Sequence, residues 1–140
     1  VTIVNRSEER GSELVKLLTT RVAESVPQSL QARFQQWDGE FQIPTETDLV
    51  VNATSIGLYP NINDTLPIVR KSLRGSMFVA DVIPNPPATK FIQLAKDCGC
   101  EVIDGLEMLV AQGVIGIRHW SGVDADPLIM RQALERVFET

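Results

Sequence analysis

The stretch Asp48-Leu-Val-Val-Asn-Ala-Thr-Ser-Ile-Gly57 decides the fold. Its residues 49–51 are consecutive and apolar, a pattern typical of a strand buried on both faces of a parallel sheet. The polar side chains that follow are Asn52, Thr54 and Ser55. Ligands of open α/β sheets bind beyond the carboxyl ends of the strands. The stretch therefore predicts a strand that delivers an amide and two hydroxyls to a ligand-binding edge. A capped strand end followed by a turn would leave the same pattern.

Apolar segments with strand and helix periods alternate along the rest of the chain. We predict further strands at residues 1–4, 30–37, 77–82 and 100–103. We predict helices at residues 8–24, 89–98, 106–118 and 126–138, and one or two helical turns at 67–73. Ser7 is the expected N-cap of the first helix, and Gly113 and Gly116 are expected to break the helix at 106–118. Strands alternating with helices predict one doubly wound, Rossmann-like domain over residues 1–140.

Composition excludes several classes of function. The net charge of −5 argues against nucleic acid or an anionic membrane as a partner. No apolar run is long enough to span a bilayer. Cys98 and Cys100 are the only cysteines and there is one histidine, so a usual zinc set is missing and we predict no metal site. Two reduced thiols in a cytoplasmic protein are the expected state. Asp81 and Asp104 end strands and could form a carboxylate pair, but capping is the favoured interpretation.

The first residues of the chain bear on the choice of cofactor. In a dinucleotide fold, an acidic residue after the second strand binds the ribose of NAD, whereas an arginine accommodates the 2′-phosphate of NADP. If residues 1–4 form that strand, its end offers Asn5 and Arg6 instead of a carboxylate. Arg6 and Arg10 could then converge on one phosphate at a helix start. Two solvated arginines are the competing interpretation.

The glycine-rich pyrophosphate loop, G-x-G-x-x-G, does not occur in these residues. We therefore expect the chain to be a fragment that begins at the second strand of the fold, with the first strand and its loop upstream.

Four motifs resemble the shikimate dehydrogenase family, in order and over nearly the whole chain. They are Asn5-Arg6-Ser7-x-x-Arg10, Asn52-Ala53-Thr54-Ser55-x-Gly57, Asp81 before an Asn-Pro loop, and Asp104-Gly105-x-x-Met108-Leu109-Val110-x-Gln112-Gly113. The chain resembles the C-terminal, cofactor-binding half of that family. The resemblance implies NADP as cofactor and the reversible reduction of 3-dehydroshikimate to shikimate.

The resemblance also implies roles for individual residues. The 2′-phosphate of NADP would be held by Asn5, Arg6, Ser7 and Arg10. The other implied cofactor contacts are Asn52, Thr54, Ser55, Val82, Gly105, Met108 and Leu109. Gln112 would reach the substrate, to which an amide offers both a donor and an acceptor. Among its apolar neighbours an inward amide would need a partner, and we expect Gln112 to face the mouth of the cleft between this domain and the N-terminal one. An ordinary polar residue on a helix is the competing interpretation.

Two departures from the family's pattern keep alternatives open. Pro84 stands where family members commonly carry a tyrosine whose hydroxyl helps to bind substrate. The family's catalytic Lys and Asp belong to an N-terminal substrate domain, so we predict no catalytic residue in this chain and expect that domain as its partner. The alternatives are a paralogue acting on quinate or another cyclic hydroxy acid, and a nucleotide-binding domain without catalysis. The oligomeric state is left open.

Overall fold

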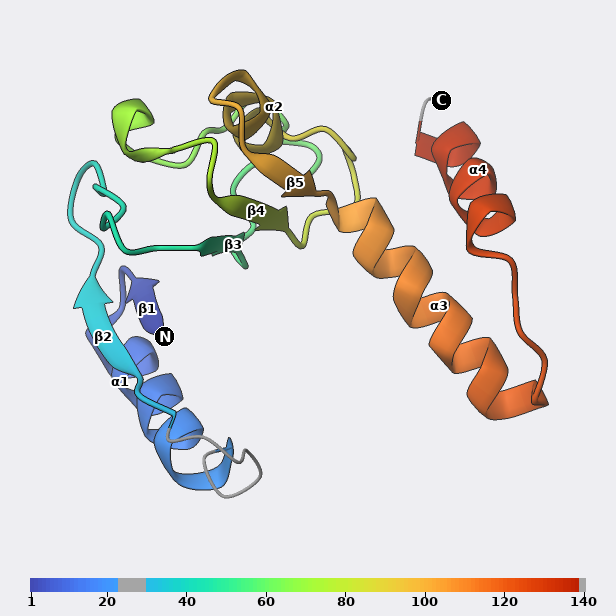
Figure 1. The fold of residues 1–140 in the computed structure, drawn as a ribbon, viewed down its shortest axis with the longest axis horizontal. Helices are drawn as coiled ribbons and strands as arrows, with labels where there is room; N and C mark the ends of the chain where they lie inside the picture. Colours follow the sequence, from blue (N-terminus) through green and yellow to red (C-terminus); the bar gives the residue numbers. More distant parts are fainter. Residues whose placement is uncertain (23–29, 139–140) are drawn as a thin grey trace. The chain divides into compact units, whose positions relative to one another are not determined.

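A computed structural model of the chain describes residues 1–22 and 30–138 (Figure 1). These residues form two compact units, Val1–Phe41 and Gln42–Thr140, and each unit is described by itself. Both units are mixed α/β structures whose paired strands are all parallel. No helix in the described residues is long and apolar enough to cross a membrane.

The first unit is a small βαβ structure. It contains β1 (Thr2–Asn5), α1 (Glu8–Leu17), a π-helical turn (Leu18–Val22) and β2 (Arg33–Gln36). The two strands pair in parallel, and Ser7 caps α1 as predicted by accepting a hydrogen bond from the Arg10 N–H. Gly11 packs on the ring of Phe34, which an added Cβ would overlap. The last residues of the predicted helix, 23 and 24, lie outside the described residues.

The second unit is built on a three-stranded parallel sheet in the order β3-β4-β5. Its strands are β3 (Leu49–Asn52), β4 (Phe78–Asp81) and β5 (Glu101–Ile103), and a short 3₁₀ helix, η3 (Arg70–Ser72), replaces the predicted helical turns. Helix α2 (Lys90–Asp97) packs on β4 and β5. Val79 and Ile92 are fully buried in this contact, so the core of the unit lies between α2 and the sheet.

The prediction that β3 is buried on both faces was wrong. The side chains of Leu49 and Val51 are 54% and 50% exposed, and that of Phe78, the register partner of Leu49, is 47% exposed. Register partners in parallel strands share a face of the sheet. Helix α2 covers the opposite face, and among the described residues of this unit no helix covers the side chains of Leu49 and Phe78.

Two long helices complete the second unit. Helix α3 (Gly105–Ser121) leads away from the end of β5, and α4 (Pro127–Phe138) runs back beside it (Figure 1). The predicted break of α3 at its glycines was wrong, because both adopt helical backbone conformations. Gly113 serves packing instead, since a Cβ there would lie 2.5 Å from Cε of Met130 in α4.

Gly105 lies against the backbone of another segment. An added Cβ at this position would overlap the backbone of Ile83, in the loop after β4. The first turn of α3 therefore approaches the sheet more closely than any side chain permits. This contact fixes where α3 begins relative to the carboxyl edge of the sheet.

We expect Gly105→Ala to lower the free energy of unfolding by about 1–3 kcal/mol, because the backbone of Ile83 would have to move. Gly116→Ala in the same helix is the matched control, since its Cβ would lie an ordinary 3.4 Å from the ring of Trp120. That control should be neutral or stabilising by up to about 1 kcal/mol. Denaturant unfolding of the two variants measures both effects, and equal stabilities would contradict the packing argument.

Candidate functional site

A buried carboxylate joins three segments at the carboxyl edge of the sheet. The side chain of Asp81 is 2% exposed. Its Oδ1 accepts hydrogen bonds from Asn52 Nδ2 (3.1 Å) and the Ile83 N–H (3.0 Å), and its Oδ2 accepts one from Thr89 Oγ1 (2.7 Å). Thr89 in turn caps α2 by accepting a bond from the Ile92 N–H. Asp81 therefore does not cap the helix itself but holds the capping residue Thr89. No cluster of potential metal ligands occurs in the described residues.

Asn52 shapes the loop that follows β3. Its Oδ1 accepts hydrogen bonds from the N–H (3.0 Å) and Oγ1 (2.8 Å) of Thr54, whose Oγ1 accepts a further bond from the Ile56 N–H (3.1 Å). The asparagine is 3% exposed, so its side chain orders the loop. In the described structure it does not present an amide at the surface, which differs from the prediction. Ser55 is exposed on this loop, which turns at Gly57 with a positive φ of 95°.

The predicted residues on α3 share one face of the helix and adjoin the same edge. The Val82 N–H donates to the Asn52 carbonyl (3.1 Å), and Gly105 abuts Ile83. Counted from Gly105, the positions i+3, i+4 and i+7 of that face are Met108, Leu109 and Gln112. Gln112 is exposed on this face of the helix. Leu106 and Val110 take the buried face of the helix instead.

The residues predicted to hold a phosphate lie at the start of α1, in the first unit. Asn5 Oδ1 accepts a hydrogen bond from the Ser7 N–H (2.9 Å), and Ser7 Oγ accepts one from the Arg10 N–H (3.3 Å). The guanidinium groups of Arg6 and Arg10 are exposed, and neither forms an ion pair or hydrogen bond with another described residue. Two unpaired cations at a helix N-terminus form an environment that favours an anion.

An ion-pair cluster at the base of α3 was not predicted from the sequence. Asp104 caps α3 by accepting a bond from the Glu107 N–H (2.8 Å), which confirms its capping role. The guanidinium of Arg131, in α4, binds both oxygens of the Asp104 carboxylate at 2.7 and 3.1 Å. The spacing of Arg131 and Glu135, four apart on one helix, was the visible signal. No local sequence pattern connects Arg131 with Asp104, which lies 27 positions earlier in the chain.

Electrostatics keep this pair charged. Burial alone would raise the pKa of Asp104, but the hydrogen bonds from Arg131 and the Glu107 N–H outweigh it, so the pKa lies below its usual value. The same hydrogen bond to Asp104 raises the pKa of Arg131. Elsewhere, both cysteines are free as predicted, and burial raises the pKa of the Cys100 thiol.

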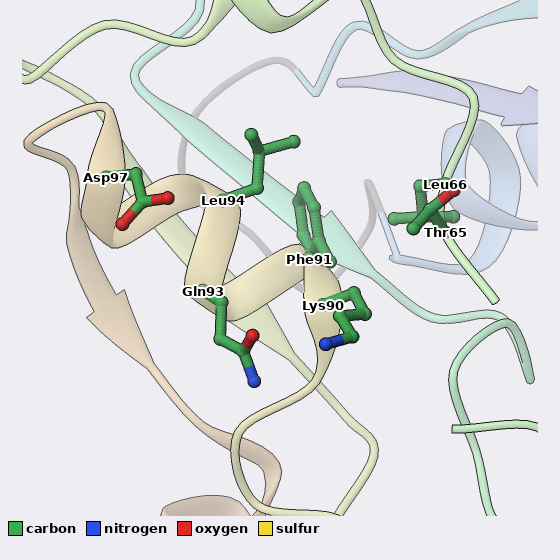
Figure 2. Close-up of a pocket in the computed structure, with 7 residues that line it drawn as sticks. All are labelled: Thr65, Leu66, Lys90, Phe91, Gln93, Leu94 and Asp97. Carbon is green, nitrogen blue, oxygen red and sulfur yellow. The ribbon is translucent and has the colours of Figure 1, made fainter. Parts of the chain in front are cut away.

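Figure 2 shows a surface pocket between α2 and the loop that precedes η3. The lining residues are Thr65, Leu66, Lys90, Phe91, Gln93, Leu94 and Asp97. None of the residues predicted to bind cofactor or substrate belongs to this set. The pocket therefore lies apart from the candidate site at the carboxyl edge of the sheet.

Known proteins resemble this chain in sequence. A model of the shikimate 5′-dehydrogenase C-terminal domain matches residues 105–135. The shikimate dehydrogenase (NADP(+)) of Archaeoglobus fulgidus is 36% identical over 136 residues, which are 97% of this chain and 47% of the relative. The chain belongs to the shikimate dehydrogenase family. It spans about half the length of the curated relatives it matches.

Solved structures confirm the Rossmann-like fold. A ligand-free 5-ketofructose reductase of Gluconobacter sp. strain CHM43 is 43% identical with a TM-score of 0.86, over 98% of this chain and 47% of that one. Shikimate 5-dehydrogenase of Thermus thermophilus, in complex with NADP(H) and shikimate, is 28% identical with a TM-score of 0.72. That match covers 97% of this chain and 45% of the other. Proteins named for different substrates therefore share this half.

We expect Asn52→Asp to lower the free energy of unfolding at about pH 8 by about 1–3 kcal/mol, because it places a second carboxylate against Asp81. The folded-state pKa of the new carboxyl should be raised. The loss should therefore shrink as the pH falls toward about 5, where the protonated group can again donate to Asp81. Denaturant unfolding at both pH values tests this, with Asn61→Asp on an exposed loop as the control. A loss that is the same at both pH values would contradict the charge argument.

Proposed function

We propose that this chain is the NADP-binding half of a dehydrogenase that reversibly reduces 3-dehydroshikimate to shikimate. The observation that carries the proposal is the pair of exposed arginines at the start of α1, whose guanidinium groups pair with no acidic residue in the described structure. An acidic residue at Asn5 would repel the 2′-phosphate of NADP, whereas Arg6 and Arg10 attract it. Relatives named for NADP(+) support this choice of cofactor.

The residues of the chain fit such a cofactor by their chemistry. Asn5, Arg6, Ser7 and Arg10 would hold the 2′-phosphate. In the second unit, the contacts we propose are Thr54, Ser55, Val82, Gly105, Met108 and Leu109, with Asn52 setting the loop that carries the two hydroxyls. Gly105 leaves the start of α3 without a side chain beside the Ile83 backbone. When bound, the nicotinamide supplies or accepts the hydride.

The role of this half is to bind and to orient. Gln112 is exposed on the helix face of Met108 and Leu109, where its amide can donate to and accept from a polyhydroxylated substrate. The Lys and Asp that move the proton in this family would come from the N-terminal substrate domain, the proposed partner of this chain. Two free cysteines fit a reducing compartment, so we place the enzyme in the cytoplasm.

A second candidate function is the reduction of a polyhydroxylated ketone such as 5-ketofructose. Two observations favour it: the 43% identity to a 5-ketofructose reductase, and Pro84 in the place of the family's substrate-binding tyrosine. The same cofactor half would serve both reactions. Steady-state assays of the full-length protein with shikimate, quinate and fructose derivatives, each with NADP and NAD, separate these candidates. Failure of every substrate, with NADPH still bound, would leave a nucleotide-binding domain without catalysis.

We expect Arg6→Ala in the full-length protein to weaken NADPH binding by roughly 10- to 150-fold, because a charge-assisted contact with phosphate is worth about 1.5–3 kcal/mol. NADH binding should change little, since NADH has no 2′-phosphate. Fluorescence titration measures both affinities. Lys16→Ala, near the C-terminal end of the same helix, is the control and should alter neither. Equal weakening of NADPH and NADH would refute the role of Arg6.

We expect Gln112→Ala to lower kcat/KM roughly 10-fold or more for the true substrate, because a hydrogen bond to the substrate is lost. The affinity for NADPH should stay nearly constant. Gln132→Ala, another exposed glutamine on the neighbouring helix, serves as the control. An unchanged kcat/KM for every substrate that the wild type turns over would remove Gln112 from the substrate site.

A further inference from the structure

We propose that Arg131 is a positioning residue for the cofactor site: acting through Asp104, it holds the first turn of α3 in place. That turn begins at Gly105 and carries Met108 and Leu109, which we have assigned to the cofactor. This inference rests on the proposed function where its test measures the reaction. The contacts from which it is argued are those within the chain itself.

The Arg131 side chain is 28% exposed and binds three carboxylates. Its Nη2 and Nη1 donate to the two oxygens of Asp104 at 2.7 and 3.1 Å, a bidentate pair. Its Nη1 also donates to Glu107 at 3.3 Å, and its Nε donates to Glu135 at 2.9 Å. A planar guanidinium held at all three nitrogens has one orientation, so the start of α3 is held at a defined position relative to α4.

The other side of the same turn has no room to move. Asp104 Oδ1 accepts the Glu107 N–H as well as the Arg131 bond, so one oxygen serves the helix cap and the ion pair. The next residue, Gly105, abuts the backbone of Ile83. A shift at Asp104 therefore moves the turn against the loop after β4. The same loop is tied to Asp81 through the Ile83 N–H.

Two of the contacts between α4 and α3 lie at different points along α3. Met130 meets Gly113 farther along α3, which holds the two helices together by packing. Arg131 meets the first turn instead. Packing at Gly113 therefore preserves the helical hairpin when the charge pair is removed, whereas the position of the first turn depends on Arg131.

The groups around Asp104 define its response to pH. Arg131 of α4 and, more weakly, Lys96 of α2 attract its charge, while Glu107 lies beside it on α3 and Glu135 is held by Arg131. Because the pKa of Asp104 is lowered on folding, the stabilisation by the pair is present above the unfolded pKa. It is lost as the pH falls through the folded pKa.

The experiment uses the full-length protein, four single variants and the double variant that combines Asp104→Asn with Arg131→Gln. Asp104→Asn keeps a good N-cap but removes the charge, and so separates capping from pairing. Arg131→Gln removes the guanidinium, and Arg131→Lys keeps the charge without the bidentate geometry. Arg136→Gln, an exposed arginine on the same helix, is the control. Amide hydrogen exchange of residues 105–109 in the protein without cofactor is the first readout. The second set of measurements comprises NADPH affinity, KM, kcat and the deuterium isotope effect with labelled NADPH.

We expect Arg131→Gln and Asp104→Asn to speed exchange at residues 105–109 and to lower kcat by roughly 10- to 100-fold, as misplacement at a reacting centre does. KM and NADPH affinity should change less than about threefold, the isotope effect should rise, and the double variant should be no worse than either single one. Arg131→Lys should restore part of kcat, and Arg136→Gln should match the wild type.

Two different failures can be told apart. A wild type that binds NADPH and turns over substrate, with variants that match it in exchange and kcat, would overturn the role of Arg131 and leave the proposed function intact. A loss of kcat that only follows the loss of thermal stability would overturn that role as well. A wild type that neither binds NADPH nor reduces any substrate would overturn both proposals.

Discussion

The second unit depends on one buried carboxylate. Asp81 is almost inaccessible to water, and a buried polar group is costly unless hydrogen bonds replace its hydration. Asn52, Ile83 and Thr89 supply those bonds from the end of β3, the loop after β4 and the cap of α2. Because each donor comes from a different segment, the carboxylate can be satisfied only when all three segments are in register. The three segments at this edge of the sheet therefore have to take their places together.

The polar side chains that we assign to binding or to its support divide into two kinds. Those of Asn52 and Asp81 are buried and engaged within the chain, and they set backbone positions. The side chains of Arg6, Arg10 and Gln112 are exposed and make no such bonds in the described structure. A ligand can gain free energy from the second kind without breaking bonds of the first. Under the proposed function, the first set supports the backbone and the second set would contact the ligand.

The chain corresponds to about half of each related enzyme, and these enzymes are named for different substrates. Its likeness to a 5-ketofructose reductase and to a shikimate dehydrogenase extends over the same residues. A cofactor presents the same atoms to every such enzyme, so the half that binds it can stay constant. Positions at the proposed substrate side, such as Pro84 and Gln112, are where this chain can carry substrate preference.

The sequence by itself determined the order of strands and helices, the caps Ser7 and Asp104, and the motifs of the family, because caps, periods and turns are local patterns. The fold and the family membership follow from these patterns. Only the tertiary structure decided which groups meet across the chain. The exposure of Leu49, the continuity of α3 at Gly113 and the pairing of Arg131 with Asp104 depend on partners far away in sequence. No local pattern encodes such contacts, since they arise from the packing of whole elements.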